Sequence, residues 1–393
     1  MTSRALPKTL RLTNQARLVE QLLRRGVATR AELAKAGGMS QPTAGKIIDE
    51  LATAGVVEEL SGASEVARSR SSVGRPGKQL RLAQSPPRLV IVELGVERTR
   101  LAAVPAALPD EERWDVDFKT PSSEALWRQR LLQHAAALPI RRPWAVMVSV
   151  PGLVDESIGK ILMCPNLHWC ERSDLVSAFH EVFRAPVLLI QENRALALAE
   201  VATRASGSDF LLVDFGDGVG GALVTGQRPY DGKVPVTGEI GHTPLAGHRR
   251  QCGCGNLGCL ETLIAAPWLV RSLAEATGEG SVTFADVCRA AQAAELPAFL
   301  VEALDATAGC IASILNVCGL KRVVLSGHIR DLGPRATEHL IGAIRRAAMW
   351  SRFDSVEVEL VQRRRARGLT IAAIQRFIMP TDWGEKSAGR PSS

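Results

Sequence analysis

Hydrophobic residues among the first 60 positions recur at helical spacing in three short groups, and each group is separated from the next by residues typical of turns. The first group, which ends at Gly26, contains Leu18, Val19, Leu22 and Leu23. Thr29 and Glu32 have the spacing of a capping box, so a second helix is predicted to begin there and to stop at Gly37.

The third group predicts a helix that Ser40 caps and that has Pro42 in its first turn. Its buried face consists of Ala44, Ile47, Ile48 and Leu51. Two short helices joined by a tight turn are typical of a helix-turn-helix, whose second helix enters the major groove of DNA. We expect the hydrogen-bonding side chains near the start of this helix to contact DNA, namely Ser40, Gln41, Thr43 and Lys46.

Two short apolar segments, Val56–Leu60 and Gln79–Leu82, are predicted to pair as a hairpin beside these helices. The chain between them is rich in Arg, Ser and Gly, which is typical of the wing of a winged helix-turn-helix. The tripeptide Gly74-Arg75-Pro76 would hold a guanidinium forward, toward a narrow minor groove or the phosphates. We therefore expect Arg75 and Lys78 to contact DNA as well.

The distribution of charge supports this interpretation. The chain has 48 Lys and Arg against 41 Asp and Glu, and the formal net charge is +7. Residues 1–85 hold 14 of the basic and 7 of the acidic residues, so the remainder is electrically balanced. A basic head favours a polyanion as partner because phosphate neutralisation releases counterions. The alternatives are a solvated basic face and a small packing or dimerisation domain.

From Pro86 onward, apolar strands alternate with helical segments, as expected for an α/β fold with buried strands. The predicted strands are Leu89–Glu93, Ala145–Val150, Val187–Ile190 and Phe210–Val213. A glycine-rich segment, Asp214–Gly221, follows the last of them. Such a segment either cradles a phosphate with its backbone N–H groups or only forms a tight hairpin, and the pattern favours neither.

His242, Cys252, Cys254 and Cys259 form the clearest chemical signal in the chain. Three thiolates and one imidazole are the ligand set of a closed tetrahedral zinc site, so we expect a structural ion with no open position. Disulfides are the competing interpretation. The remaining cysteines are expected to be small buried hydrophobic residues, namely Cys164, Cys170, Cys288, Cys310 and Cys318.

A length of 393 residues, with 46% hydrophobic and 23% charged residues, is typical of a globular protein of two or three domains. Residues 1–10 lack the apolar stretch of a secretory signal, and no apolar run approaches the roughly 18 residues of a membrane span. We therefore expect a cytoplasmic protein without a membrane partner, in a compartment where clustered cysteines bind metal rather than oxidise.

Several motifs resemble those of the ROK family, which contains sugar kinases and sugar-responsive repressors. The motifs are the Gly-Arg-Pro of the wing, Pro151–Asp155, Pro165–Trp169, Gly238–His242, the cysteine cluster and Leu260-Glu261. The resemblance to the repressor branch implies a winged helix-turn-helix in residues 1–85, followed by a two-lobed, actin-like (ribonuclease H-like) α/β sugar-kinase body. The lobes would span residues 86–194 and 195–393, with the C-terminal helix returning to the first lobe.

The resemblance also implies that a sugar binds between the lobes, against Asn166, Asn193, Glu239, His242 and Glu261. Neutral amides and carboxylates supply the mixed donors and acceptors that sugar hydroxyls need. His242 would then serve both sites, with one ring nitrogen toward zinc and the other toward the sugar.

Two departures from the kinase pattern bear on catalysis. Arg194 stands where the family's kinases have the Asp that accepts the hydroxyl proton, and a guanidinium is no general base at neutral pH. Val96 and Glu97 replace small residues of the first phosphate loop. We expect no enzyme but a sugar-responsive DNA-binding regulator, most simply a repressor that acts on operator DNA as a homodimer or homotetramer. The alternatives are an active ATP-dependent sugar kinase with an accessory head and a regulator that has lost sugar binding.

Overall fold

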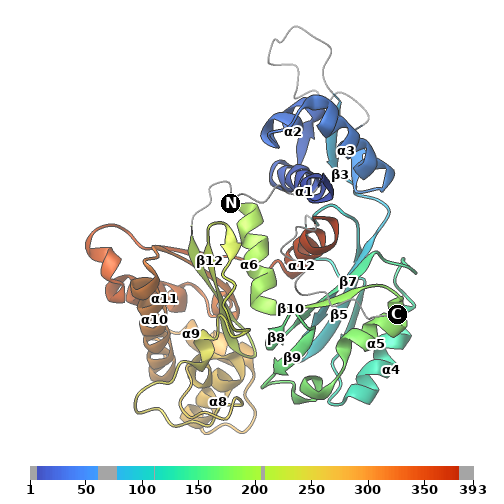
Figure 1. The fold of residues 1–393 in the computed structure, drawn as a ribbon. Coiled ribbons are helices and arrows are strands. Elements are labelled where there is room, and N and C mark those ends of the chain that lie inside the picture. Colours follow the sequence, from blue (N-terminus) through green and yellow to red (C-terminus); the bar gives the residue numbers. More distant parts are fainter. Residues whose placement is uncertain (1–6, 61–77, 110, 205–208, 380–393) are drawn as a thin grey trace.

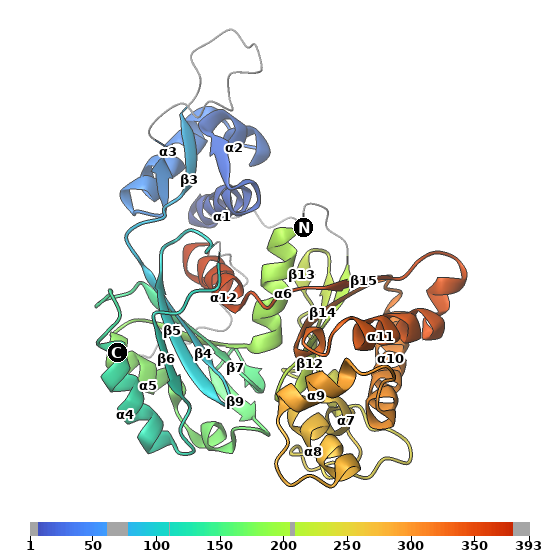
Figure 2. The same cartoon turned by 180° about the vertical axis from the view of Figure 1, so that it is seen from behind.

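The computed structural model describes residues 7–60, 78–109, 111–204 and 209–379. A small head sits above two larger lobes that lie side by side, and both views show helix α12 between the head and the first lobe (Figures 1 and 2).

The head contains the three predicted helices and a small sheet. Its elements are α1 (Pro7–Arg25), β1 (Val27–Thr29), α2 (Arg30–Ala36), α3 (Gln41–Thr53), β2 (Val57–Glu59) and β3 (Gln79–Leu82). The capping box of Thr29 and Glu32 and the cap at Ser40 are both present. Strands β2 and β3 pair antiparallel as predicted, and β1 adds to the other edge of β3. The wing tip, with Arg75, lies outside the described residues.

The first lobe is built on a five-stranded sheet of order β10-β7-β4-β5-β6. Its strands are β4 (Leu89–Leu94), β5 (Arg98–Val104), β6 (Val116–Lys119), β7 (Ala145–Val150) and β10 (Val187–Gln191). The other elements here are α4 (Glu124–Ala135), α5 (Leu175–Phe183) and a small hairpin of β8 (Leu153–Asp155) and β9 (Lys160–Met163).

The second lobe repeats this design with the order β13-β12-β11-β14-β15. Its strands are β11 (Phe210–Phe215), β12 (Val219–Thr225), β13 (Arg228–Pro229), β14 (Arg322–Gly327) and β15 (Glu357–Leu360). Its helices are α7 (Glu261–Ile264), α8 (Ala266–Thr277), α9 (Phe284–Ala291), α10 (Ala298–Cys318) and α11 (Pro334–Ala347).

Two helices join the parts of the molecule. Helix α6 (Glu192–Thr203) follows β10 of the first lobe and covers one face of the second sheet through Leu196 and Ala197. Helix α12 (Arg365–Ala373) continues into a π-helical turn, η6 (Ile374–Ile378), and contacts β4, β7 and α6. The hydrophobic core of the head is continuous with the face of the first sheet that α12 covers.

Helix α10 is long and apolar enough to cross a membrane by length and composition, although no segment of this kind was expected from the sequence. Half of its most apolar stretch is buried, and the helix packs against α11 in the core of the second lobe. These contacts are those of a core helix.

Candidate functional site

A polar cavity of about 280 Å³ lies between the lobes. One wall comes from the ends of β4, β7 and β10, and the other from the glycine-rich turn between β11 and β12. The structure brings all five predicted sugar ligands to this cavity, namely Asn166, Asn193, Glu239, His242 and Glu261. Gln191, which the sequence did not single out, also lines it.

The glycine-rich segment forms a hairpin, since β11 and β12 pair antiparallel from Phe210 to Val224. Its glycines also make room for polar side chains of the cavity. A Cβ atom on Gly220 would lie 1.9 Å from Nδ2 of Asn193, and one on Gly218 would lie 2.6 Å from Oε2 of Glu261. The turn therefore admits these two side chains to the cavity.

Glu239 lies deep in this site. Its Oε1 accepts a hydrogen bond of 2.8 Å from Nε2 of Gln191, and its Oε2 lies 3.7 Å from Nε2 of His242. Burial, reinforced by the charge of Glu261, raises the pKa of Glu239 to about 7. Near neutral pH this carboxyl group therefore both accepts and donates hydrogen bonds, which suits a hydroxyl-bearing ligand.

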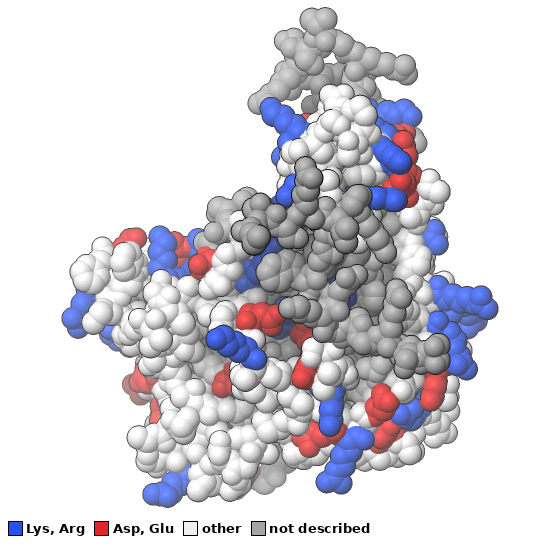
Figure 3. Space-filling model, in the orientation of Figure 1, with Lys and Arg blue, Asp and Glu red and all other residues white. Residues whose placement is uncertain are grey.

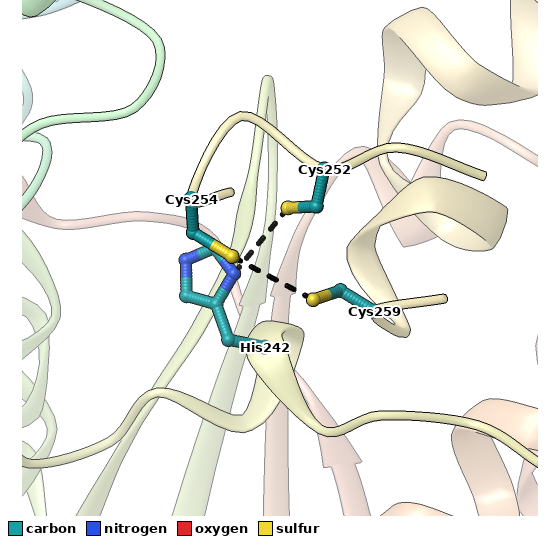
Figure 4. Close-up of side chains that lie close together, drawn as sticks. All are labelled: His242, Cys252, Cys254 and Cys259. Carbon is teal, nitrogen blue, oxygen red and sulfur yellow. Dashed lines mark hydrogen bonds between the residues drawn. The ribbon is translucent and has the colours of Figure 1, made fainter. Parts of the chain in front are cut away.

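The predicted metal ligands converge beside the cavity, with their ligand atoms all within 4.8 Å of one another (Figure 4). Sγ of Cys252 lies 3.6 Å from Nδ1 of His242, and Sγ of Cys254 lies 3.7 Å from Sγ of Cys259. Tetrahedral zinc, with bonds of about 2.3 Å to sulfur and about 2.0 Å to nitrogen, sets the S···N separation at about 3.5 Å and the S···S separation at about 3.8 Å. The four side chains therefore fit a tetrahedral metal ion.

Two side chains link the metal cluster to the cavity. His242 turns Nδ1 toward the thiols and Nε2 toward Glu239. Glu261 is buried, accepts a hydrogen bond of 3.2 Å from the N–H of Val219, and accepts a weak one of 3.6 Å from the thiol of Cys252. The geometry of the cluster and the geometry of the cavity thus depend on each other.

Two arginines of the basic run 363–367 line the other end of the cleft, namely Arg363 and Arg365. Arg363 donates from Nε and Nη2 to the two carboxylate oxygens of Asp214 at 2.7 and 2.8 Å, and Nη2 also reaches the carbonyl of Phe215 at 2.6 Å. A Cβ atom on Gly216 would lie 2.7 Å from Arg363 Nη2, so the guanidinium lies directly against the glycine-rich turn.

Arg365 connects the end of β4 with the start of α6. It forms an ion pair with Glu192 at the start of α6 and lies 3.2 Å from Oε1 of Glu93 at the end of β4. Arg100 approaches the same Glu93 at 3.3 Å. Burial raises the pKa of Glu93, and the guanidinium of Arg365 opposes that change. Two arginines therefore neutralise the carboxylate at the first phosphate loop.

Arg194 differs from its expected place in the cleft. Its guanidinium lies 3.5 Å from Glu156 and 3.5 Å from Asp231, and its side chain lines two neighbouring cavities rather than the one that holds the predicted sugar ligands. Successive residues of a helix point about 100° apart, so Asn193 faces the cavity while Arg194 turns away from it.

The predicted DNA contacts lie on the exposed surface of the head. Gln41, Thr43 and Lys46 are exposed on α3, and Ser40 Oγ accepts the N–H of Thr43 as the helix cap. Lys78, at the base of the wing, pairs with Glu59 at 2.7 Å. Figure 3 shows Lys and Arg side chains on both flanks of the head.

Known proteins share this architecture. The ROK family model matches residues 91–370. The chain is 22% identical over 394 residues to a xylose repressor of Caldicellulosiruptor bescii, covering 94% of this chain and 96% of the relative. A ROK family transcriptional regulator, described as a homologue of the E. coli MLC protein, superposes over 94% of this chain and 97% of its own, with a TM-score of 0.71 and 21% identity.

A ROK hexokinase from Thermus thermophilus is 26% identical and superposes over 73% of this chain and 96% of its own, with a TM-score of 0.58. The two regulators thus match nearly the whole chain, whereas the hexokinase matches about three quarters of it. Because the family model covers well over half of the sequence, this chain belongs to the ROK family.

Proposed function

We propose that the chain is a sugar-responsive transcriptional repressor, whose head binds operator DNA and whose body binds a carbohydrate without phosphorylating it. The single observation that carries the proposal is a polar interlobe cavity, lined by neutral amides and carboxyl groups, in the same chain as a helix-turn-helix head. Relatives named as repressors that match along almost the entire chain support it.

We propose that the body lacks kinase activity. A phosphoryl-transfer site needs room and positive potential for the nucleotide phosphates, together with a base for the attacking hydroxyl. Here the Arg363 guanidinium lies against the glycine-rich turn, where it takes up room. Arg365 forms ion pairs with Glu93 and Glu192, so its charge is already balanced. Arg194 stands in the sequence where the family's kinases have the base. A coupled assay with ATP and a panel of hexoses and pentoses tests this, and turnover well above background would favour the alternative, an active sugar kinase.

The metal cluster is proposed to hold a structural Zn²⁺ ion on His242, Cys252, Cys254 and Cys259. When bound, the ion would cross-link His242 at the end of η3 (Ile240–His242) to the cysteines of the segment that leads into α7. His242 would then be held with Nδ1 toward the thiols, which leaves Nε2 to donate to Glu239 or to a sugar hydroxyl.

For the head, Ser40, Gln41, Thr43, Lys46, Arg75 and Lys78 are proposed to contact DNA. We propose a division into the head (1–85) and lobes of residues 86–194 and 195–393, with α12 as part of the first lobe.

A homodimer or homotetramer is proposed because one small winged module seldom binds tightly alone and half-site spacing mirrors two-fold symmetry. Exposed apolar side chains would be buried by a second copy, namely Val317, Met349, Trp350 and Phe353. A DNA-binding regulator of this kind acts in the cytoplasm.

A thermal shift measurement against pentoses and hexoses, beginning with xylose, tests the sugar site, because a ligand that binds the folded state raises the melting temperature. Glu239→Gln and Asn166→Ala should abolish the shift, while Glu279→Gln, exposed and remote from the cavity, should retain it. A shift that survives in both cavity variants would place the sugar elsewhere.

The head is tested by selecting bound DNA from random duplexes and measuring its affinity by fluorescence anisotropy. If no DNA sequence is enriched by the selection, sequence-specific DNA binding is contradicted.

A further inference from the structure

Helix α12 touches both the proposed sugar site and the DNA-binding head. Its first residue, Arg365, lines the interlobe cavity with a side chain that is 14% exposed, and it donates from Nε to Oε1 of Glu192 at 2.6 Å. Glu192 precedes Asn193 in α6, and both side chains line the interlobe cavity. The start of α12 is thus tied to a residue next to the proposed sugar ligand.

The body of α12 packs too closely on α6 for the two helices to move apart independently. A Cβ atom on Gly368 would lie 1.9 Å from the carbonyl oxygen of Ala195, so the helix backbones touch. Every residue from Gly368 to Ala373 is buried, and Glu112 accepts the N–H of Ala366 at 2.9 Å. Because packed interiors shift between discrete arrangements rather than deform smoothly, displacement of α6 must carry α12 with it.

The far end of α12 is fastened to the head. The helix continues as η6, and the carbonyl oxygen of Ile378 accepts a hydrogen bond of 3.0 Å from Nε2 of Gln15 in α1. Ile374 and Ile378 share one hydrophobic cluster with Leu18 and Leu22 of α1. From Arg365 to Ile378 the helical segment spans roughly 20 Å, at about 1.5 Å per residue.

We propose that α12 is the element that transmits ligand occupancy from the interlobe cavity to the DNA-binding head, with Arg365 as its contact at the cavity and Gln15 as its contact at the head. The inference rests on the proposed function. A sugar that draws Asn193 and Glu192 to a new position moves Arg365, and α12 then shifts Ile378 against α1. The ligand acts because it favours one position of α12 over another.

The experiment uses the full-length protein and measures DNA affinity by anisotropy, without sugar and with the pentose or hexose that gives the largest thermal shift. Wild type should change its DNA Kd by about 5- to 150-fold on saturation, a typical allosteric coupling. Gln15→Met removes the donor and keeps a side chain of similar length. Its sugar affinity should equal that of wild type, while its sugar-dependent change in DNA Kd falls below about 2-fold.

Gln21→Met is the matched control, because Gln21 lies on the same helix and its side chain accepts a hydrogen bond from Arg25 of that helix. It should keep the full response. A full sugar response in Gln15→Met would overturn the proposal.

A second comparison needs no sugar and so separates failure of this proposal from failure of the proposed function. Glu192→Gln weakens the hold on Arg365 and should change the DNA Kd by about 2- to 30-fold when Gln15 is present. In the Gln15→Met background the same substitution should change it by less than about 2-fold. Additive effects of the two substitutions would overturn the coupling through α12. A wild type that ignores every sugar but shows this non-additivity would contradict only the assigned effector class.

Discussion

Arg363 donates to both carboxylate oxygens of Asp214, at 2.7 and 2.8 Å, across 149 positions of sequence. Ser326 donates to Oδ1 of the same carboxylate at 2.5 Å. Asp214 is the penultimate residue of β11, and the Arg363 guanidinium that it holds lies against Gly216 of the glycine-rich turn.

Loss of this ion pair should destabilise the fold. Arg363→Met leaves Asp214 charged and buried without its partner, which should lower the free energy of unfolding by about 3–5 kcal/mol. The double variant Arg363→Met with Asp214→Asn should recover much of the loss because no uncompensated charge remains. Urea denaturation measures all three proteins. A cost below about 1 kcal/mol for the single variant would show that the pair contributes little.

The same pair should make stability depend on acid pH. Burial alone would raise the pKa of Asp214, but Arg363, Arg365 and Ser326 hold that pKa below its ordinary value. A carboxyl group whose pKa is lowered by folding stabilises the protein above its unfolded pKa of about 3.9, and the contribution is lost as pH falls through the folded pKa. The stability difference between wild type and Asp214→Asn should therefore be full at about pH 6 and shrink below about pH 4, as measured by urea denaturation.

Removal of the metal should weaken both the fold and the sugar response. Treatment with a zinc chelator should lower the melting temperature, and Cys254→Ser should abolish bound zinc in elemental analysis. Cys318→Ser changes an exposed thiol at the end of α10 and should keep one zinc ion per chain. Zinc content that is the same in Cys254→Ser and wild type would contradict the assigned ligands.

The glycine at position 220 should be needed for the sugar site. A methyl group there would displace the amide of Asn193, so Gly220→Ala should weaken sugar binding at least about 10-fold, equal to the loss of one good hydrogen bond to the ligand. Gly309→Ala, in α10, meets no atom within 4 Å and should leave sugar affinity unchanged. Isothermal titration of both variants checks the difference, and equal affinities would show that Asn193 makes no contact with the sugar.

Lys46 offers the cleanest test of the recognition helix, since Ser40 also caps that helix and its loss would cost about 1 kcal/mol of stability. Lys46→Ala should weaken DNA binding. If Lys46 contacts a phosphate, the slope of log Kd against log salt should fall by about 1, and Arg75→Ala should do the same. Lys160→Ala, on β9 of the first lobe, should match wild type. Unchanged affinity in Lys46→Ala would exclude the exposed face of α3 as the DNA surface.

Local features of the sequence were enough to predict much of this molecule. The caps at Thr29 and Ser40, the buried face of α3 and strands β4, β7, β10 and β11 follow from short-range patterns, which local hydrogen bonds and burial enforce. The cysteine cluster was predictable because its ligands lie within 18 positions of one another. The sugar ligands came from family resemblance, since Asn166 and Glu261 reach one cavity only through the tertiary fold.

The roles of Arg363 and Arg365 could not be predicted. Their carboxylate partners lie 149 and 173 positions away, on other strands and helices, so the run of arginines has no local signature that separates a solvated face from a buried ion-pair network. The direction of the Arg194 side chain likewise depends on the residue at which α6 begins. A one-residue shift of that start would have turned its guanidinium into the cavity.

Helix α12 covers strands β4 and β7, although the ribosome makes those strands more than 200 residues earlier. At 5–20 residues per second, roughly 10 to 50 s separate the completion of β5 from the emergence of Arg365. During that interval the nascent first lobe exposes an apolar sheet face to chaperones and proteases. A premature stop codon before Arg365 would leave this face uncovered for good, so such alleles should be lost by degradation rather than persist as unregulated DNA binders.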